Sequence, residues 1–405
     1  MSPTDIWAFI GPYFSFEGVL ALLNALGLLV TSVFVQWGLM PNKLTVEPTV
    51  FVAENEYQIA WESKYPSSAW VIVDGEKYVD SVGGHLMIDQ TVHKVSVPMD
   101  ALDAAKKYEI YWQHQMRGPL VRKQSKVMSK GYNFRPADFS DGFQSYHVSD
   151  THSLMKLAGE ASGYWGDKLD LLILNGDIAT DLEMPRMCVD VMRLAWTVAK
   201  GERPVLYARG NHESRGANVN DFHRCVGTPS ADRWYFTTRL GSLWIAVYDA
   251  AEDKADADEE YGGRADFEQY RAKETEFFDN VIANAQTEFD ALDVEYRLLV
   301  CHVPVGSSHK WYPEVMEAWL KQANQMKLDL ALHGHLHKVE YFAPGVYKNY
   351  DEPANYPVII GCKPVHSGEE GLFVGTAVEF QSTAVRSWFT NQKREIITTL
   401  PVTTR

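Results

Sequence analysis

The stretch Tyr207–Gly216, which reads YARGNHESRG, decides how the rest of the chain is interpreted. It begins in an apolar run, Pro204–Ala208, that is typical of a buried strand. Gly210 permits a tight turn after this strand, so the side chains of Asn211 and His212 are expected to face one cleft. The cluster gains significance because other polar clusters follow other apolar runs.

From Ser145 onwards, apolar runs alternate with helical patterns. The runs are SYHVSD, LDLLILNGD, RPVLYARGN, SLWIAVYD, YRLLVCH and LDLALHGH, and each ends in polar residues. Such runs are typical of strands buried between layers, with a site at their carboxyl ends. The clearest helix is predicted from about Met184 to Lys200, with Pro185 in its first turn. We therefore predict an α/β domain over residues 139–405.

The polar clusters form a chemically complete metal site. They are Asp150-Thr151-His152, Gly176-Asp177, Asn211-His212, His302 and His335-Leu336-His337. Asp150, Asp177, Asn211, His302 and His335 are separated by successive intervals of 27, 34, 91 and 33 residues. One aspartate bridges two cations readily, and imidazole and amide groups supply neutral ligands. Asp177 is the natural bridge.

This mixture of nitrogen and oxygen ligands, without thiolate, favours two divalent ions of Mn, Fe, Zn or Co, and it does not choose among them. Two such ions against two aspartates leave a positive pocket that suits a phosphate ester.

The order DxH, GD, GNHE, H and GHxH resembles the calcineurin-like metallophosphoesterase superfamily over roughly Ser145 to Thr399. The resemblance implies an α+β four-layer β-sandwich flanked by helices. It also implies that the first metal binds Asp150, His152, Asp177 and His337, and that the second binds Asp177, Asn211, His302 and His335. In this family a hydroxide that bridges the metals is the nucleophile, and the residue matching His212 is the outer-sphere catalytic residue.

The implied reaction is hydrolysis of a phosphoric ester, with a phosphomonoesterase as the leading reading. A phosphodiesterase or nucleotide hydrolase is the alternative, because superfamily motifs do not specify the organic group. A scaffold that kept the fold and lost the chemistry is disfavoured, since every ligand position is filled. Arg215, just after the motif, is a candidate to bind a phosphate oxygen, with an ordinary surface arginine as the alternative.

Residues 42–138 show short alternating segments without any cysteine, and Asp74-Gly75 is a strong hairpin signal. They predict an all-β sandwich of the fibronectin or immunoglobulin type. A sandwich before such a catalytic domain resembles the layout of purple acid phosphatases. The site departs from that family, because Thr180 stands where those enzymes have tyrosine and because His152 is present. We therefore expect a colourless enzyme.

Residues 1–41 include Gly18–Met40, a run of 23 residues without a charged side chain. That length suits a helix that crosses a bilayer, with a buried core helix as the alternative. A cleavable signal peptide is poorly supported, since no Lys or Arg precedes the run. We predict a membrane anchor that leaves the catalytic domain outside the bilayer, on a side that the sequence does not define.

Charge and cysteine content argue against nucleic-acid-binding, zinc-knuckle and disulfide-rich proteins. The chain of 405 residues has 38 basic and 53 acidic residues, a formal charge of -15, which argues against a broad footprint on a nucleic-acid backbone. Its four cysteines lie far apart and form no CxxC pair, so neither a zinc knuckle nor a dense disulfide framework is indicated, although one or two bridges remain open. The acidic loop Glu252–Glu260 is predicted to be a solvated excursion.

Overall fold

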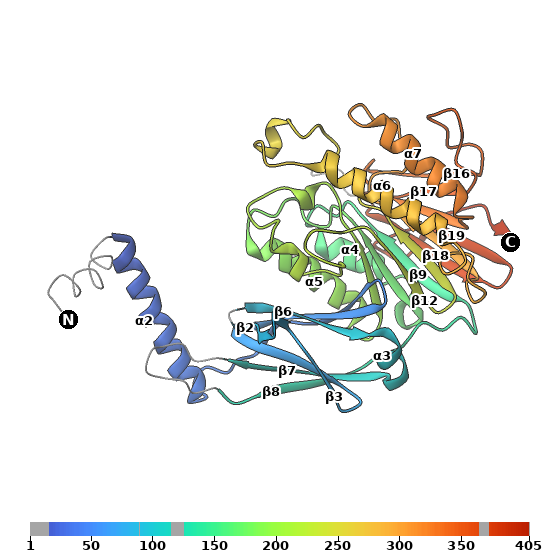
Figure 1. Ribbon diagram of the computed structural model, residues 1–405. Helices are drawn as coiled ribbons and strands as arrows, with labels where there is room; N and C mark the ends of the chain where they lie inside the picture. Colours follow the sequence, from blue (N-terminus) through green and yellow to red (C-terminus); the bar gives the residue numbers. More distant parts are fainter. Residues whose placement is uncertain (1–15, 89, 115–124, 364–371, 405) are drawn as a thin grey trace.

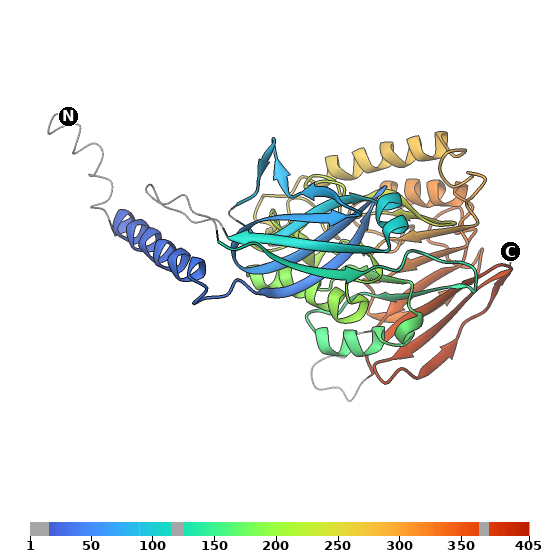
Figure 2. The ribbon, with the colours of Figure 1, turned by 90° about the horizontal axis from the view of Figure 1, so that it is seen from below.

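The computed structural model describes residues 16–88, 90–114, 125–363 and 372–404. A long N-terminal helix projects from a body in which sheets are covered by helices (Figure 1, Figure 2). Residues 1–15 of the predicted N-terminal segment lie outside the described residues.

Two sheets form the body. The larger has the strand order β20 (Ile396–Thr399), β19 (Ala384–Asn391), β18 (Val374–Gln381), β9 (Phe143–Val148), β10 (Leu171–Asn175), β11 (Pro204–Ala208), β1 (Leu44–Ala53), β2 (Glu56–Val73), β7 (Lys107–His114) and β8 (Met128–Asn133). The smaller has the order β12 (Phe236–Leu240), β13 (Leu243–Val247), β14 (Tyr296–Val300), β15 (Leu330–His333), β17 (Val358–Cys362) and β16 (Lys338–Phe342). The larger sheet also includes β3 (Glu76–Val79) and β6 (Gln90–Pro98), which pair with β2, and β21 (Thr403–Thr404), which pairs with β19. β4 (Ser81–Val82) and β5 (His85–Leu86) form a separate two-stranded sheet.

The alternation of side chains along the buried strands sets the layers. In β10, Leu171 and Ile173 join the core between the two sheets, whereas Leu172 and Leu174 pack with residues of α5 (Pro185–Ala199). Residues of β13 that point away from the larger sheet pack instead with α6 (Phe267–Ala283) and α7 (Pro313–Gln325). Together with α4 (Met155–Ser162), these helices cover the outer faces, so the layer order is helix, sheet, sheet, helix. The predicted mixed α/β fold is confirmed.

The helix predicted at Met184–Lys200 is confirmed as α5, Pro185–Ala199. Pro185 occupies the start, where its missing N–H costs nothing. Lys200 ends the helix in the left-handed conformation, with φ of 58°. The helix packs its apolar face on the larger sheet and thereby holds the loop that precedes it, residues 176–184, which carries Asp177.

The N-terminal strands share the sheet of the catalytic strands. β1 pairs in parallel with β11, through Val50 with Pro204 and Val52 with Leu206. The two segments expected as separate strands around residues 57–61 and 69–73 are halves of one strand, β2, which pairs with β1 and β6 along one half and with β3 and β7 along the other. A short helix, α3 (Met99–Ala105), also interrupts the predicted all-β region.

The predicted hairpin is present, because Asp74 and Gly75 both have positive φ between β2 and β3. The fibronectin-like classification and the boundaries 42–138 and 139–405 stay predictions, since one sheet runs through both regions.

The N-terminal helix α2 (Phe16–Gln36) is the one described helix that is long and apolar enough to cross a membrane, a test that a signal sequence also passes. Leu20, Leu22, Leu23 and Leu26 of this helix are exposed. Only its last turns reach the body, where Val35 is buried and the Ser32 hydroxyl bonds His114 Nε2 at 3.0 Å. The alternative of a buried core helix therefore does not describe α2.

Candidate metal centre

The predicted ligands lie in loops at the carboxyl ends of β9, β10, β11, β14 and β15. The structure brings side chains from these loops together in facing groups, Asp150 with His152 and His337, and Asp177 with His302 and His335. Within each group the ligand atoms lie within 4.8 Å of one another. A further group contains His152, Asp177 and His212, so the groups share members and form one cluster.

The backbone of this cluster is strained. Five of the predicted ligands have positive φ, between 43° and 68°: Asp150, His152, Asp177, His335 and His337. Such conformations are uncommon for residues other than glycine and concentrate at functional sites. The folded scaffold therefore enforces loop shapes that turn these side chains toward one another.

The first group surrounds Asp150, which is fully buried. The backbone N–H of His335 donates to both of its carboxylate oxygens at 3.0 Å. His337 Nε2 lies 3.4 Å from Asp150 Oδ1, and the Nε2 atoms of His152 and His337 lie 2.9 Å apart. Two imidazole nitrogens and one carboxylate oxygen thus face the same small volume, as metal ligands do.

The second group surrounds His302. Its Nδ1 donates to the Asn175 carbonyl at 2.7 Å, which turns Nε2 toward Asp177 Oδ2 at 3.2 Å. Nε2 is buried and has no hydrogen-bond partner, because its ion-pair contact with Asp177 lacks hydrogen-bond geometry. Asn211 Oδ1 lies 3.1 Å from His335 Nδ1 on the opposite side. A buried ring nitrogen without a partner, beside carboxylate and amide oxygens, fits a metal ion.

The pKa values in the cluster also indicate a site for a cation. Burial lowers the pKa of His152 and of His335 to about 4, so both rings are neutral at neutral pH. Burial also opposes a charge on His302, but the carboxylates of Asp177 and Asp150 outweigh it and raise the pKa of His302 to about 10. Burial raises the pKa of Asp150 to about 7. The buried carboxylates therefore attract a proton to His302, in the position that a cation would take.

Glu213 is a supporting residue to which the sequence assigned no role. It is buried, and its Oε2 accepts from the backbone N–H groups of Asp177 at 2.8 Å and Gly210 at 3.0 Å. Its Oε1 accepts from Ile178 at 2.7 Å and Ala179 at 3.0 Å. The last residue of GNHE thus holds the loop that presents Asp177.

Gly210 has a different role from the expected tight turn. Its φ is not positive, but a Cβ atom at this position would lie 2.3 Å from both the backbone nitrogen and Oδ1 of Asp177. Glycine is required here because the two loops approach each other closely.

His212 lies at the edge of the cluster, with a quarter of its side chain exposed. Its Nδ1 donates to the Thr180 carbonyl and lies 3.4 Å from Asp181 Oδ1. Its Nε2 lies 3.9 Å from Asp177 Oδ2. Asp181, four residues after Asp177, therefore also contacts the His212 ring.

Arg215 is engaged elsewhere. Its Nε and Nη2 donate to the two carboxylate oxygens of Glu252 at 2.7 and 3.0 Å, and Nη1 lies 3.3 Å from Glu260. These ion pairs fit the alternative of an arginine without a role in substrate binding better than they fit phosphate binding. Phosphate binding by Arg215 stays a prediction. The acidic loop also needs correction, because Glu252 is fully buried and accepts from Tyr261 Oη at 2.6 Å.

Asp253, which the sequence did not single out, brings this loop to the cluster, with its Oδ2 at 3.7 Å from His335 Nε2. A carboxylate opposite the far nitrogen of a ligand histidine is a common way to fix the ring.

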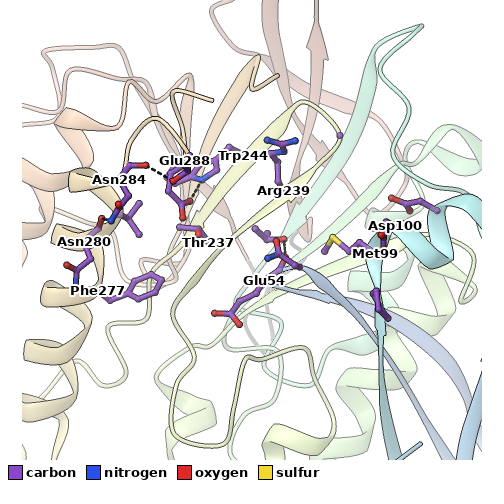
Figure 3. Close-up of a pocket in the computed structure, with 17 residues that line it drawn as sticks. Glu54, Met99, Asp100, Thr237, Arg239, Trp244, Phe277, Asn280, Asn284 and Glu288 are labelled. Carbon is purple, nitrogen blue, oxygen red and sulfur yellow. Dashed lines mark hydrogen bonds between the residues drawn. The ribbon is translucent and has the colours of Figure 1, made fainter. Parts of the chain in front are cut away.

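A large cleft lies away from this cluster. It has a volume of about 1020 Å³ and lies between the β1–β2 turn, α3, β12 and α6 (Figure 3). Its lining includes Glu54, Asp100, Asp103 and Glu288, and its arginine, Arg239, is paired with Asp293. The acidic lining does not suit a phosphate ester, so the metal cluster is the better candidate site.

Comparison with known proteins identifies structures with a similar fold and one matching family. Two solved structures share the fold over most of the chain. A purple acid phosphatase from seeds of yellow lupin (Lupinus luteus) is 13% identical with a TM-score of 0.57, covering 90% of this chain and 75% of that chain. A protein described as PhoD is 11% identical with a TM-score of 0.52, covering 90% of each chain. No curated protein matches significantly. The family model of calcineurin-like phosphoesterases matches residues 144–339, a range that contains all the predicted metal ligands.

Proposed function

We propose that the chain is a phosphoric ester hydrolase that uses two divalent transition-metal ions. The observation that carries the proposal is the pair of facing ligand groups, with the buried Nε2 of His302 left without a hydrogen-bond partner between them. Asp150, His152, Asp177 and His337 would hold the first ion. Asp177, Asn211, His302 and His335 would hold the second. When bound, the ions would supply Lewis-acid charge neutralisation and an activated water.

The protein's own groups would then position and protonate the substrate. His212 is suited to assist the leaving group, because its Nδ1 is bound to the Thr180 carbonyl and its Nε2 is directed to the Asp177 side of the cluster. A histidine with a fixed ring and a partly exposed edge can donate a proton to the leaving oxygen or bind its developing charge. Its contact with Asp181 helps to hold the ring in this orientation.

We propose a monoesterase rather than a diesterase as the first case to test. The site lies at loop ends at the surface, and the neutral rings of His152 and His335 leave its charge to the carboxylates and the bound cations. A dianionic monoester gains more than a monoanionic diester from such a cationic pocket.

The N-terminal helix is proposed as a membrane anchor. Its exposed leucines give it an apolar surface that the body does not cover, and Gly18–Met40 carries no charge. The catalytic domain would then act beside a membrane, on a side that these observations do not define.

The decisive test is a substrate panel on the full-length protein in detergent, with Mn, Zn, Fe or Co added after chelation. An aryl monoester, an aryl diester, a cyclic nucleotide and pyrophosphate separate the reaction classes. We expect the monoester to be hydrolysed fastest and the activity to disappear on chelation. The control is His302→Ala, in which the second ligand group is incomplete. Equal activity in this variant and the wild type, or no activity with any metal, would refute the proposal.

A further inference from the structure

Two of the four cysteines lie together, although they are far apart in the sequence. Cys188 is in the first turns of α5, and Cys225 follows the short helical turn Phe222–Arg224. Both are free, and both are nearly buried, with 4% and 3% of their surfaces exposed. Both side chains belong to one buried cluster, which also contains Val189 of α5 and Val226. Both also line one cavity of about 340 Å³, which gives a small reagent a route to the sulfur atoms.

The backbone around Cys225 is held on both sides by charged side chains. Lys94 Nζ donates to the carbonyls of His223 at 2.6 Å and Val226 at 3.1 Å. Arg224 Nη2 donates to Asp80 Oδ2 at 2.8 Å and to a carbonyl of β6. Cys225 is thereby fixed to β6 on one side while α5 presents Cys188 on the other. Both cysteines are therefore held in place by regular elements of the fold around the cavity that they share.

The two thiols are chemically unequal. The hydrogen bond with Cys225 lowers the pKa of the Cys188 thiol, and the start of a helix is a position that favours a thiolate. The same hydrogen bond, together with burial, raises the pKa of Cys225. Cys188 is therefore the sulfur that loses its proton first and attacks an oxidant, and Cys225 is the sulfur that responds.

We propose that Cys188 and Cys225 are a redox-active thiol pair that hydrogen peroxide converts into a reversible disulfide. In the first step the Cys188 thiolate attacks one peroxide oxygen, an S–O bond forms and the O–O bond breaks. This gives a sulfenic acid and hydroxide, with the sulfur oxidised by two electrons and the peroxide reduced by two. In the second step the Cys225 sulfur attacks the sulfenyl sulfur, an S–S bond forms and the S–O bond breaks. The departing hydroxide takes the Cys225 proton and leaves as water.

The bond would enclose the phosphoesterase motif. Asn211, His212 and Glu213 all lie between Cys188 and Cys225 in the chain. The segment before α5 contacts the His212 ring through Thr180 and Asp181. A disulfide would therefore join the two ends of the segment that carries GNHE and limit its local opening.

The test is a thiol count on the full-length protein in detergent, treated with hydrogen peroxide, quenched and denatured. We expect four reactive thiols before treatment, two after it, and four again after reduction, with Cys188 and Cys225 linked in the peptide map. Cys362→Ala is the matched control, since Cys362 is also buried but is not part of the pair. It should fall from three thiols to one.

Two variants separate the steps. In Cys225→Ala the sulfenic acid at Cys188 has no resolving partner, so dimedone should label Cys188. In Cys188→Ala the same treatment should leave all three thiols reactive. Four thiols after peroxide treatment of the wild type, a disulfide between any other pair, or sulfinic acid at Cys188 without a cross-link would each overturn the proposal. None of these readouts depends on phosphoesterase activity, so the outcome is independent of the proposed function.

Discussion

The carboxylate of Glu213 supports the loop of Asp177, and its loss can be predicted amide by amide. In Glu213→Gln the shape is kept, but only one oxygen remains as an acceptor. If that oxygen stays with Ile178 and Ala179, the new NH₂ group faces the N–H groups of Asp177 and Gly210, which accept nothing.

An unsatisfied buried donor costs roughly 1–3 kcal/mol, so this variant should lose about 2 kcal/mol or more in the opening free energy of the loop. Glu213→Ala removes the acceptor for four N–H groups, and on the same basis it should lose about 4 kcal/mol unless water enters the space.

Hydrogen exchange of individual backbone amides is the appropriate assay, because a chain of this size need not unfold in two states. A loss of about 2 kcal/mol should speed exchange of the Asp177 and Gly210 amides by roughly 30-fold in Glu213→Gln, with a smaller change at Ile178 and Ala179. Metal content should fall as well, since groups that support metal ligands typically affect affinity by about 10- to 100-fold.

The matched control is Glu183→Gln, an exposed glutamate in the segment between β10 and α5. It makes the same change of charge without touching the four amides, so exchange there should match the wild type. If Glu213→Gln exchanges no faster than this control and keeps its metals, Glu213 does not support the site.

Four further predictions concern the metal centre and the anchor. Elemental analysis should find two transition-metal ions per chain and no visible charge-transfer band, because Thr180 supplies no phenolate; one ion at most under metal-replete conditions would contradict the dinuclear site. Metal affinity should rise by up to about tenfold per pH unit from pH 7 towards 10, because binding displaces the proton from His302, whose pKa is raised to about 10. Calorimetry in two buffers should detect the proton that His302 releases when metal binds. In the metal-free protein, the raised pKa means that the His302 ion pair contributes fully to the free energy of unfolding below about pH 6.5 and that this contribution is lost above about pH 10. Asp177→Asn should lose both metals and activity, whereas His212→Asn should keep its metals and lose about 100- to 10,000-fold in rate, less on nitrophenyl esters than on alkyl esters. A chain that begins near Lys43 should be soluble and active, and aggregation of that truncation would show that the body needs the helix for its stability.

The sequence predicted the catalytic strands well because each is a short apolar run followed by polar residues, and both signals are local. It predicted α5 to within a residue at each end, since Pro185 and Gly201 mark the boundaries. The parallel pairing of β1 with β11 was not predictable in this way. About 150 residues separate these strands, and no property of either run identifies its partner.

The burial of charged side chains was the other feature that the sequence did not predict. A glutamate in a polar stretch usually indicates solvent exposure, so Glu252 was predicted to lie in a solvated loop. Its burial depends on Arg215, which lies in another segment, and on Tyr261, which directly follows the loop. Such a pairing has no periodic pattern, and a single sequence gives no sign of it. The contact between Cys188 and Cys225 has the same character, because it depends on how α5 and a distant loop pack.

The four residues of the tetrapeptide GNHE are needed for different physical reasons. Gly210 is needed because any side chain would collide with Asp177, and Glu213 because four backbone N–H groups have no other acceptor. Both residues act on the loop of Asp177, whereas Asn211 and His212 face the site. The motif therefore combines two residues that shape the neighbouring loop with two residues that face the predicted metal site. Substitutions at its outer positions should disturb metal binding through the Asp177 backbone, even though neither outer residue is itself a predicted ligand.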